Sequence, residues 1–150
     1  VTNFKKFLAD SFKALGQNQG LWGVNANCNA FHATKGDKFG AHSLCNTFIG
    51  YVNDKRINLT IAEKHDMDRL LQFIKLGLPT LKRGDWGIKT KYWTNKGGIA
   101  TDYDIEKRKK VQSKDANDLM KKFPNCCWTK TRPNGIVDIR LKRHPFGKPE

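Results

Sequence analysis

The feature that most constrains the fold of this chain is the triplet Pro133-Asn134-Gly135, which lies between two β-prone runs within residues 126–143. Proline fixes φ near the value that a type I turn requires, and glycine can adopt the left-handed conformation that completes a three-residue hairpin loop. The sequence therefore predicts a β-hairpin with a defined register. The predicted facing pairs are Arg132 with Ile136, Thr131 with Val137, Lys130 with Asp138, Thr129 with Ile139, Trp128 with Arg140, and Cys127 with Leu141.

This register separates the hairpin into two chemically different faces, because successive side chains of a strand point to opposite sides. The packing face carries Cys127, Thr129, Thr131, Val137, Ile139 and Leu141. The other face, called the outer face below, carries Trp128, Lys130, Arg132, Arg140 and Lys142 together with one acid, Asp138. Such a face suits a nucleic-acid backbone and a stacked base. The alternative is a solvated face on which the tryptophan lies across aliphatic stems of its neighbours.

The charge of the chain indicates a polyanionic partner. Among 150 residues, 28 Lys and Arg face 14 Asp and Glu, which gives a net charge of +14 and an isoelectric point of about 9.8. Residues 1–81 hold ten basic and six acidic side chains, whereas residues 82–150 hold eighteen basic and eight acidic side chains. The second half of the chain is therefore the more basic. A charge this large repels itself, and nucleic acid is the first candidate to neutralise it. An anionic membrane surface or an acidic protein is the second.

Length and composition predict one domain. A chain of 150 residues with 38% hydrophobic residues can bury a core. We expect residues 1–150 to form a single basic nucleic-acid-binding domain. Its expected parts are an N-terminal helix at 2–15, a basic C-terminal half at 82–143 and a loose tail at 145–150.

Helix signals occur in three segments. The first places apolar side chains at helical spacing. The second begins with a capping-box pattern at Thr60 and Glu63 and ends at Gly77, which resembles a Schellman stop. The third begins after a serine and ends before a proline. The three expected helices span residues 2–15, 60–77 and 114–123.

Strand signals fill most of the remaining chain. Strands are expected at 81–93 and, after a turn at 95–98, at 99–111, and residues 17–53 have the composition of an irregular antiparallel region. The order of elements predicts an α+β fold with mostly antiparallel sheet, β-hairpins, about three helices and a hairpin-helix-hairpin pseudo-repeat. The expected strand at 99–111 ends in the densest basic run, Lys107, Arg108, Lys109 and Lys110. A basic run of this kind either contacts a polyanion or protects a solvated sheet edge.

Four side chains around a glycine-rich turn have the donor atoms of a zinc site. They follow the spacing C-x3-H-x9-H-x2-C, and two ligand pairs across a short loop could form a tetrahedron. The four candidate ligands are Cys28, His32, His42 and Cys45. The alternative is that the cysteines are small buried apolar residues. We expect no cofactor unless zinc binds here.

Three acids could form a carboxylate cluster that holds Mg²⁺ for a nuclease. Asp102, Asp104 and Glu106 alternate along the expected strand at 99–111, beside Lys107. Metal-dependent nucleases use convergent carboxylates of this kind. The alternative, which we favour, is that these acids balance charge at a sheet edge, so we expect no catalytic residues.

These observations predict a non-enzymatic nucleic-acid-binding protein with a regulatory or architectural role, such as transcription regulation. Lys and Arg would grip phosphates and Trp would contact bases, and we favour double-stranded DNA over RNA. The expected contact residues are Lys89, Lys91, Trp93, Lys107, Arg108, Lys109, Lys110, Trp128, Lys130, Arg132, Arg140, Lys142 and Arg143. The alternatives are a small metal-dependent nuclease and a basic adaptor that docks on an acidic protein partner.

Cysteine usage and hydropathy predict the compartment. Four cysteines, two of them adjacent, do not resemble a secreted disulfide framework. The sequence contains no run of about 18 apolar residues, so we expect no membrane span. We expect a reducing compartment, either the cytoplasm or the nucleoid or nucleus, and a homodimer would double the basic surface.

Overall fold

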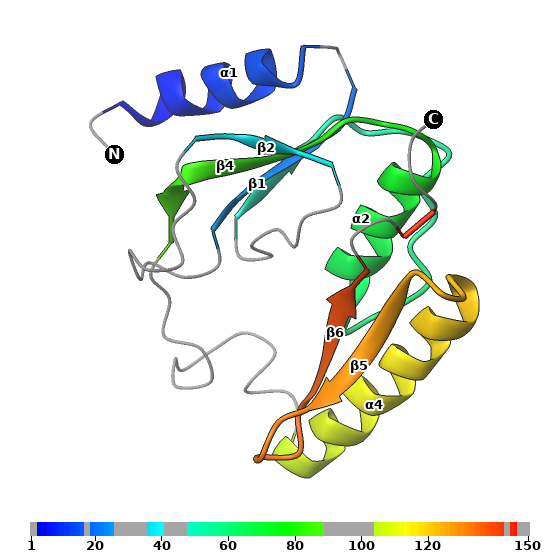
Figure 1. The fold of residues 1–150 in the computed structure, drawn as a ribbon. Coiled ribbons are helices and arrows are strands. Elements are labelled where there is room, and N and C mark those ends of the chain that lie inside the picture. The colour runs from blue at the N-terminus through cyan, green and yellow to red at the C-terminus, as the bar shows by residue number, and fades with distance from the viewer. Residues whose placement is uncertain are drawn as a thin grey trace. The chain divides into compact units, whose positions relative to one another are not determined.

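The computed structural model describes residues 3–16, 19–25, 36–40, 48–88, 104–142 and 145–146. These residues form three helices and six strands in mixed, mostly antiparallel sheets, which confirms the predicted α+β class (Figure 1). The chain divides into two compact units. The first comprises Val1–Asn58 and Arg69–Lys89, and the second comprises Leu59–Asp68 and Thr90–Glu150. The pseudo-repeat stays a prediction.

The first unit is built on a four-stranded sheet with the strand order β2-β4-β1-β3. The strands are β1 (Leu21–Asn25), β2 (Lys38–Phe39), β3 (Ile49–Tyr51) and β4 (Thr80–Gly87). β1 pairs antiparallel with β3 and parallel with β4, and β2 pairs antiparallel with β4. The parallel pair joins segments that are far apart in the sequence, so no local turn signal indicates it.

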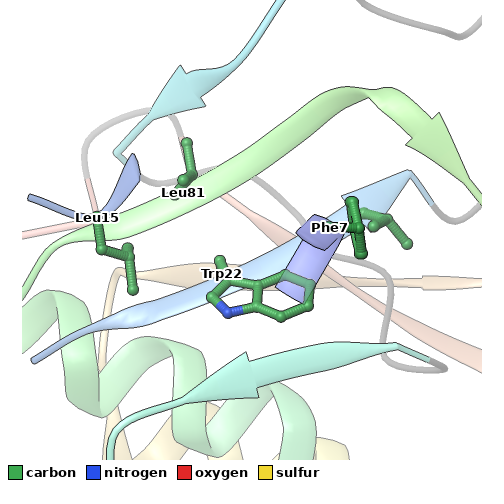
Figure 2. Close-up of a cluster of buried hydrophobic side chains, with 5 residues drawn as sticks. Phe7, Leu15, Trp22 and Leu81 are labelled. Carbon is green, nitrogen blue, oxygen red and sulfur yellow. The ribbon is translucent and has the colours of Figure 1, made fainter. Parts of the chain in front are cut away.

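Helix α1 (Phe4–Ala14) lies across one side of this sheet, as predicted for the N-terminal segment (Figure 1). Its first turn is capped by Asn3, whose side chain accepts a hydrogen bond from the backbone N–H of Lys6 at 2.9 Å. Its apolar stripe packs on β1 and β4. Figure 2 shows the resulting cluster around Trp22, to which α1 contributes Phe7.

Trp22 is the centre of this core and is only 1% exposed. Its indole meets the ring of Phe7 edge-on at a centroid distance of 5.6 Å, and Phe12 and Phe48 approach to 5.7 and 5.6 Å. On the neighbouring strand, Gly50 leaves the space that the indole fills, because a Cβ at this position would overlap the ring. The fit requires glycine at this register position.

Helix α2 (His65–Lys75) begins later than the capping-box pattern predicts. The backbone N–H of Thr60 donates to the Asp68 carboxylate at 3.0 Å, and that of Glu63 donates to the Asp115 carboxylate at 2.7 Å. The predicted reciprocal bonds between Thr60 and Glu63 are therefore wrong. These two backbone groups fasten the segment before α2 to carboxylates that lie farther along the chain.

The end of α2 follows the prediction. Gly77 has a φ of 67°, and the N–H of Leu78 donates to the carbonyl of Phe73 at 3.0 Å, as in a Schellman motif. Within the first unit, the ring of Phe73 is buried and lies 6.4 Å from that of Tyr51. This contact packs the second half of α2 against the sheet.

The second unit contains a helix where a strand was expected. Helix α4 (Ile105–Lys122) starts at Asp104, whose side chain accepts from the backbone N–H of Glu106 at 3.4 Å. The expected strand at 99–111 is thus wrong from residue 105 onward, and the expected helix at 114–123 is nine residues too short at its start. Residues 99–103 lie outside the described residues.

The two halves of α4 are buried by different chemistry. The second half packs through the buried side chains Ala116 and Leu119. The first half is held by polar groups: Arg108 pairs with Glu63 at 3.5 Å, and Gln112 donates to the same carboxylate at 3.4 Å. Because this face of the helix is polar, the sequence shows no apolar periodicity that would predict a helix there.

Strands β5 (Cys127–Thr131) and β6 (Val137–Leu141) form the predicted antiparallel hairpin, which lies along α4 (Figure 1). The observed pairs are Cys127 with Leu141, Trp128 with Arg140, Thr129 with Ile139, Lys130 with Asp138, and Thr131 with Val137. At the turn, Gly135 has a φ of 82° and its N–H donates to the carbonyl of Arg132 at 2.9 Å. The predicted register is confirmed at every one of these pairs.

None of the helices in the described part of the chain is both long and apolar enough to span a bilayer. Of the expected tail, the structure describes two residues. Pro145 is buried, and the ring of Phe146 lies 6.3 Å from that of Phe123. Residues 147–150 lie outside the described residues.

Candidate nucleic-acid interface

The outer face of the β5–β6 hairpin is open to solvent. The exposed side chains on it are Trp128, Lys130, Arg132, Arg140 and Lys142. On the packing face, Cys127 and Ile139 are buried, whereas Thr129, Val137 and Leu141 are half-buried and Thr131, next to the turn, is exposed. Burial raises the pKa of the Cys127 thiol. Strand alternation therefore puts four cations and a tryptophan on one side of a two-stranded ribbon.

One carboxylate organises two of these cations. Asp138 lies between two guanidinium groups, with its Oδ2 at 2.8 Å from Arg132 Nε and at 3.5 Å from Arg140 Nη2. The hydrogen bond from Arg132 to this carboxylate raises the pKa of the guanidinium. The face carries four cations and one carboxylate, so its net charge is +3. Its single carboxylate is shared by two arginines.

The two lysines of the outer face are exposed and can contact an external partner. Lys130 faces Asp138 in the strand register, yet the carboxylate is engaged by the arginines. Lys142 donates its backbone N–H to the carbonyl of Cys126 at 3.0 Å, and its side chain is exposed. Within the described ranges, neither ammonium group has an ion-pair partner. Both can therefore bind an external anion.

A third lysine near this face was not predicted. Lys64 precedes α2 and is half-buried, and burial lowers the pKa of its ammonium group. Nearby Asp66 and Asp138 oppose this shift by attraction, whereas Arg132 adds to it by repulsion. Lys64 is far from the hairpin in sequence, so no local pattern could have associated it with the outer face.

The basic run at 107–110 does not form a common surface. It lies on α4, where consecutive side chains are separated by about 100° around the axis. Arg108 pairs with Glu63, and Lys109 pairs with Glu106 at 2.7 Å. Lys107 and Lys110 are exposed. The expected basic strand edge is wrong, because the segment is helical and Arg108 and Lys109 pair with acids of the second unit.

The nuclease hypothesis expected carboxylates that alternate along a strand, and this arrangement is wrong for the described acids because the segment is helical. Asp104 caps α4, and the Glu106 carboxylate holds Lys109. These two acids lie at the N-cap and in the first turn of a helix, and they do not alternate along a strand face. Asp102 lies outside the described residues.

Part of the expected nucleic-acid surface and all of the expected zinc site fall on residues that the structure does not describe. Those outside the described residues are Lys89, Lys91, Trp93 and Arg143 of the expected nucleic-acid surface, and Cys28, His32, His42 and Cys45 of the expected zinc site. Zinc binding stays a prediction. In the ranges that are described, no group of three or more His, Cys, Asp or Glu could hold a metal ion.

The first unit contains an apolar cavity of about 90 Å³ beside α1. Its lining includes the rings of Phe4, Phe7, Phe48 and Trp86, with Trp86 and Phe7 at a centroid distance of 4.5 Å. All of its lining side chains are apolar. A cavity without a titratable or nucleophilic group offers no catalytic chemistry, so it does not compete with the outer face as a candidate site.

Comparison of the chain with protein-family models, with curated proteins and with solved structures finds no match.

Proposed function

We propose that this chain binds nucleic acid through the outer face of the β5–β6 hairpin, in a regulatory or architectural role and without catalysis. The observation that carries the proposal is the exposed row of four cations and Trp128 on one face of a two-stranded ribbon. Phosphate neutralisation by Lys and Arg releases counterions and supplies most of the affinity of such proteins. The net charge of +14 adds long-range attraction.

The ribbon offers two kinds of contact. Lys130 and Lys142 carry free ammonium groups that suit phosphate oxygens. The guanidinium groups of the arginines are planar and can form bidentate hydrogen bonds with phosphates or base edges. A two-stranded ribbon also fits the major groove of B-form DNA, which is about 12 Å wide. This fit is the reason that the sequence favours double-stranded DNA over RNA, whereas the exposed ring of Trp128 favours a single strand.

The proposal is tested by fluorescence anisotropy with labelled double-stranded DNA, single-stranded DNA and RNA, each over a series of salt concentrations. The double variant Lys130→Ala/Lys142→Ala is compared with Lys5→Ala/Lys13→Ala, which removes the same charge from exposed positions of α1. Each lost phosphate contact lowers the slope of log K against log salt by about 0.9 for duplex DNA or about 0.7 for single strands.

We expect the outer-face variant to lose a total slope of about 1.8 on a duplex or about 1.4 on a single strand, since two contacts are removed. The α1 variant should keep nearly the wild-type slope. Equal losses in both variants would show that binding is not localised to the hairpin. A wild-type protein that binds weakly and without salt dependence would refute nucleic-acid binding altogether.

A further inference from the structure

We infer that the outer face holds unpaired bases, with Trp128 as the stacking surface, so that its ligand class is single-stranded nucleic acid. The inference deepens the proposed function and depends on it. The first observation that supports it is the solvent exposure of the Trp128 ring. Trp128 is 49% exposed, whereas Trp22 is buried and Trp86 packs against Phe7.

The exposed part of the Trp128 ring has no internal partner in the described part of the chain. No aromatic ring packs against it there and no cation lies over it; the cation–π contacts of Arg69 and Arg83 are made to Tyr51 and Phe7. A half-exposed indole on a strand presents a flat apolar surface and a polar edge. Stacking of a nucleobase covers such a surface and is worth more than leaving it in water.

The register of the hairpin fixes what surrounds the ring. Arg140 lies directly opposite Trp128, and side chains in such a pair have Cβ atoms about 4.5 to 5.5 Å apart. Lys130 lies two residues farther along β5, in one direction from the ring. Lys142 pairs with the residue two positions before Trp128 and therefore lies in the other direction.

This arrangement places one free ammonium group on each side of the ring along the strand axis. Lys130 and Lys142 are separated by four residue steps, or about 13 Å at 3.3 Å per residue. A nucleotide stacked on Trp128 would direct the phosphate before it and the phosphate after it toward these two lysines. Asp138 occupies the neighbouring arginines, so the uncompensated charge is concentrated on this line.

Stacking on Trp128 separates single strands from duplexes. In a duplex the faces of the bases are covered by their neighbours, and a protein meets only phosphates and base edges. In a single strand the faces are accessible, and aromatic side chains stack on them with little regard to sequence. The lysines can serve either ligand, whereas the indole face can serve only an unpaired base.

The test compares binding of a ten-nucleotide oligothymidine strand with binding of a ten-base-pair duplex over a series of salt concentrations, for the wild type, Trp128→Ala and Trp128→Phe. The control is Phe39→Ala, which removes a ring that is 57% exposed on β2 of the first unit. We expect the wild type to prefer the single strand. Trp128→Ala should weaken single-strand binding by about 5- to 150-fold, and duplex binding by less than about twofold.

Trp128→Phe should recover much of the lost affinity, because a phenyl ring still stacks. The salt slope should not change in any of these variants, because none alters the charge. Circular dichroism melting checks that each variant is folded.

Failure of the inference and failure of the proposed function give different results. A wild type that prefers the duplex, or equal losses from Trp128→Ala and Phe39→Ala, would overturn the inference alone. A wild type that binds neither oligonucleotide would overturn both.

Discussion

Two adjacent residues of β6 are expected to respond to substitution in opposite ways. Ile139 belongs to the packing face and is 9% exposed, whereas Arg140 is on the outer face with a half-exposed side chain. We predict that Ile139→Asp destabilises the second unit severely and that Arg140→Ala leaves its stability almost unchanged. The pair tests the assignment of the two faces directly, because the substitutions differ by one position in the strand.

The expected magnitudes follow from burial. Truncating a buried isoleucine costs about 2 to 5 kcal/mol, and placing a carboxylate in the same apolar site adds desolvation of several kcal/mol or forces its protonation. The sum approaches the total stability of an ordinary domain, which is about 5 to 15 kcal/mol. Arg140 makes an exposed pair with Asp138 at 3.5 Å. Removing such a pair changes stability by about 0 to 1 kcal/mol.

The assay is urea unfolding followed by circular dichroism. Ile139→Val is the matched control, because it keeps an apolar side chain and should cost only about 0.5 to 1.5 kcal/mol. Ile139→Asp should shift the unfolding midpoint far below that of the control or leave the second unit unfolded in buffer. An Ile139→Asp protein as stable as the wild type, or an Arg140→Ala protein that loses more than about 1 kcal/mol, would refute the assignment of the faces.

Two further predictions concern the first unit. Gly50→Ala should destabilise the protein by about 1 to 3 kcal/mol, because the new methyl group would overlap the buried indole of Trp22; an unchanged melting temperature would contradict this fit. Hydrogen bonds from Arg56 lower the pKa of Asp54 from 3.8 to about 2. The stabilisation from this carboxylate is therefore complete above about pH 4 and is lost as pH falls through about 2. In an NMR pH titration the Arg56→Ala variant should return the Asp54 pKa toward 3.8, and a wild-type midpoint already near 3.8 would contradict the pairing.

The strand pairing of the hairpin could be predicted because its determinants are local. Pro133 and Gly135 fix the turn, and the turn fixes the register. The register then sorts each side chain to one face, so the exposure of Trp128 and Lys130 followed from strand alternation. The Gly77 stop of α2 was predictable for the same reason, since its hydrogen bonds join neighbouring residues.

The start of α4 could not be predicted from hydrophobic periodicity. Its first half is held through Arg108 and Gln112, which contact the Glu63 carboxylate, and Asp115, just beyond, accepts from the backbone N–H of Glu63. Polar side chains at these positions resemble a solvated segment until their distant partners are known. The sequence did contain one helix signal, the cap at Asp104, and the alternation of β-prone residues before it favoured a strand instead.

Contacts between distant segments account for the remaining differences. The parallel pairing of β1 with β4 and the approach of Lys64 to the hairpin depend on residues that are not neighbours in the chain. The sharing of Asp138 by two arginines depends on side-chain geometry within the outer face. These features decide which cations of the site are free, and strand alternation alone does not determine them.

The central claim is that the outer face of the hairpin contacts nucleic acid. The most direct measurement is an NMR titration of ¹⁵N-labelled protein, first with a ten-nucleotide oligothymidine strand and then with a ten-base-pair duplex, followed through backbone amides and tryptophan indole N–H signals. The account predicts that the indole signal of Trp128 and the amides of residues 128–132 and 138–142 shift together, and that those of α1 do not. Shifts confined to other parts of the chain, or none at all, would contradict it.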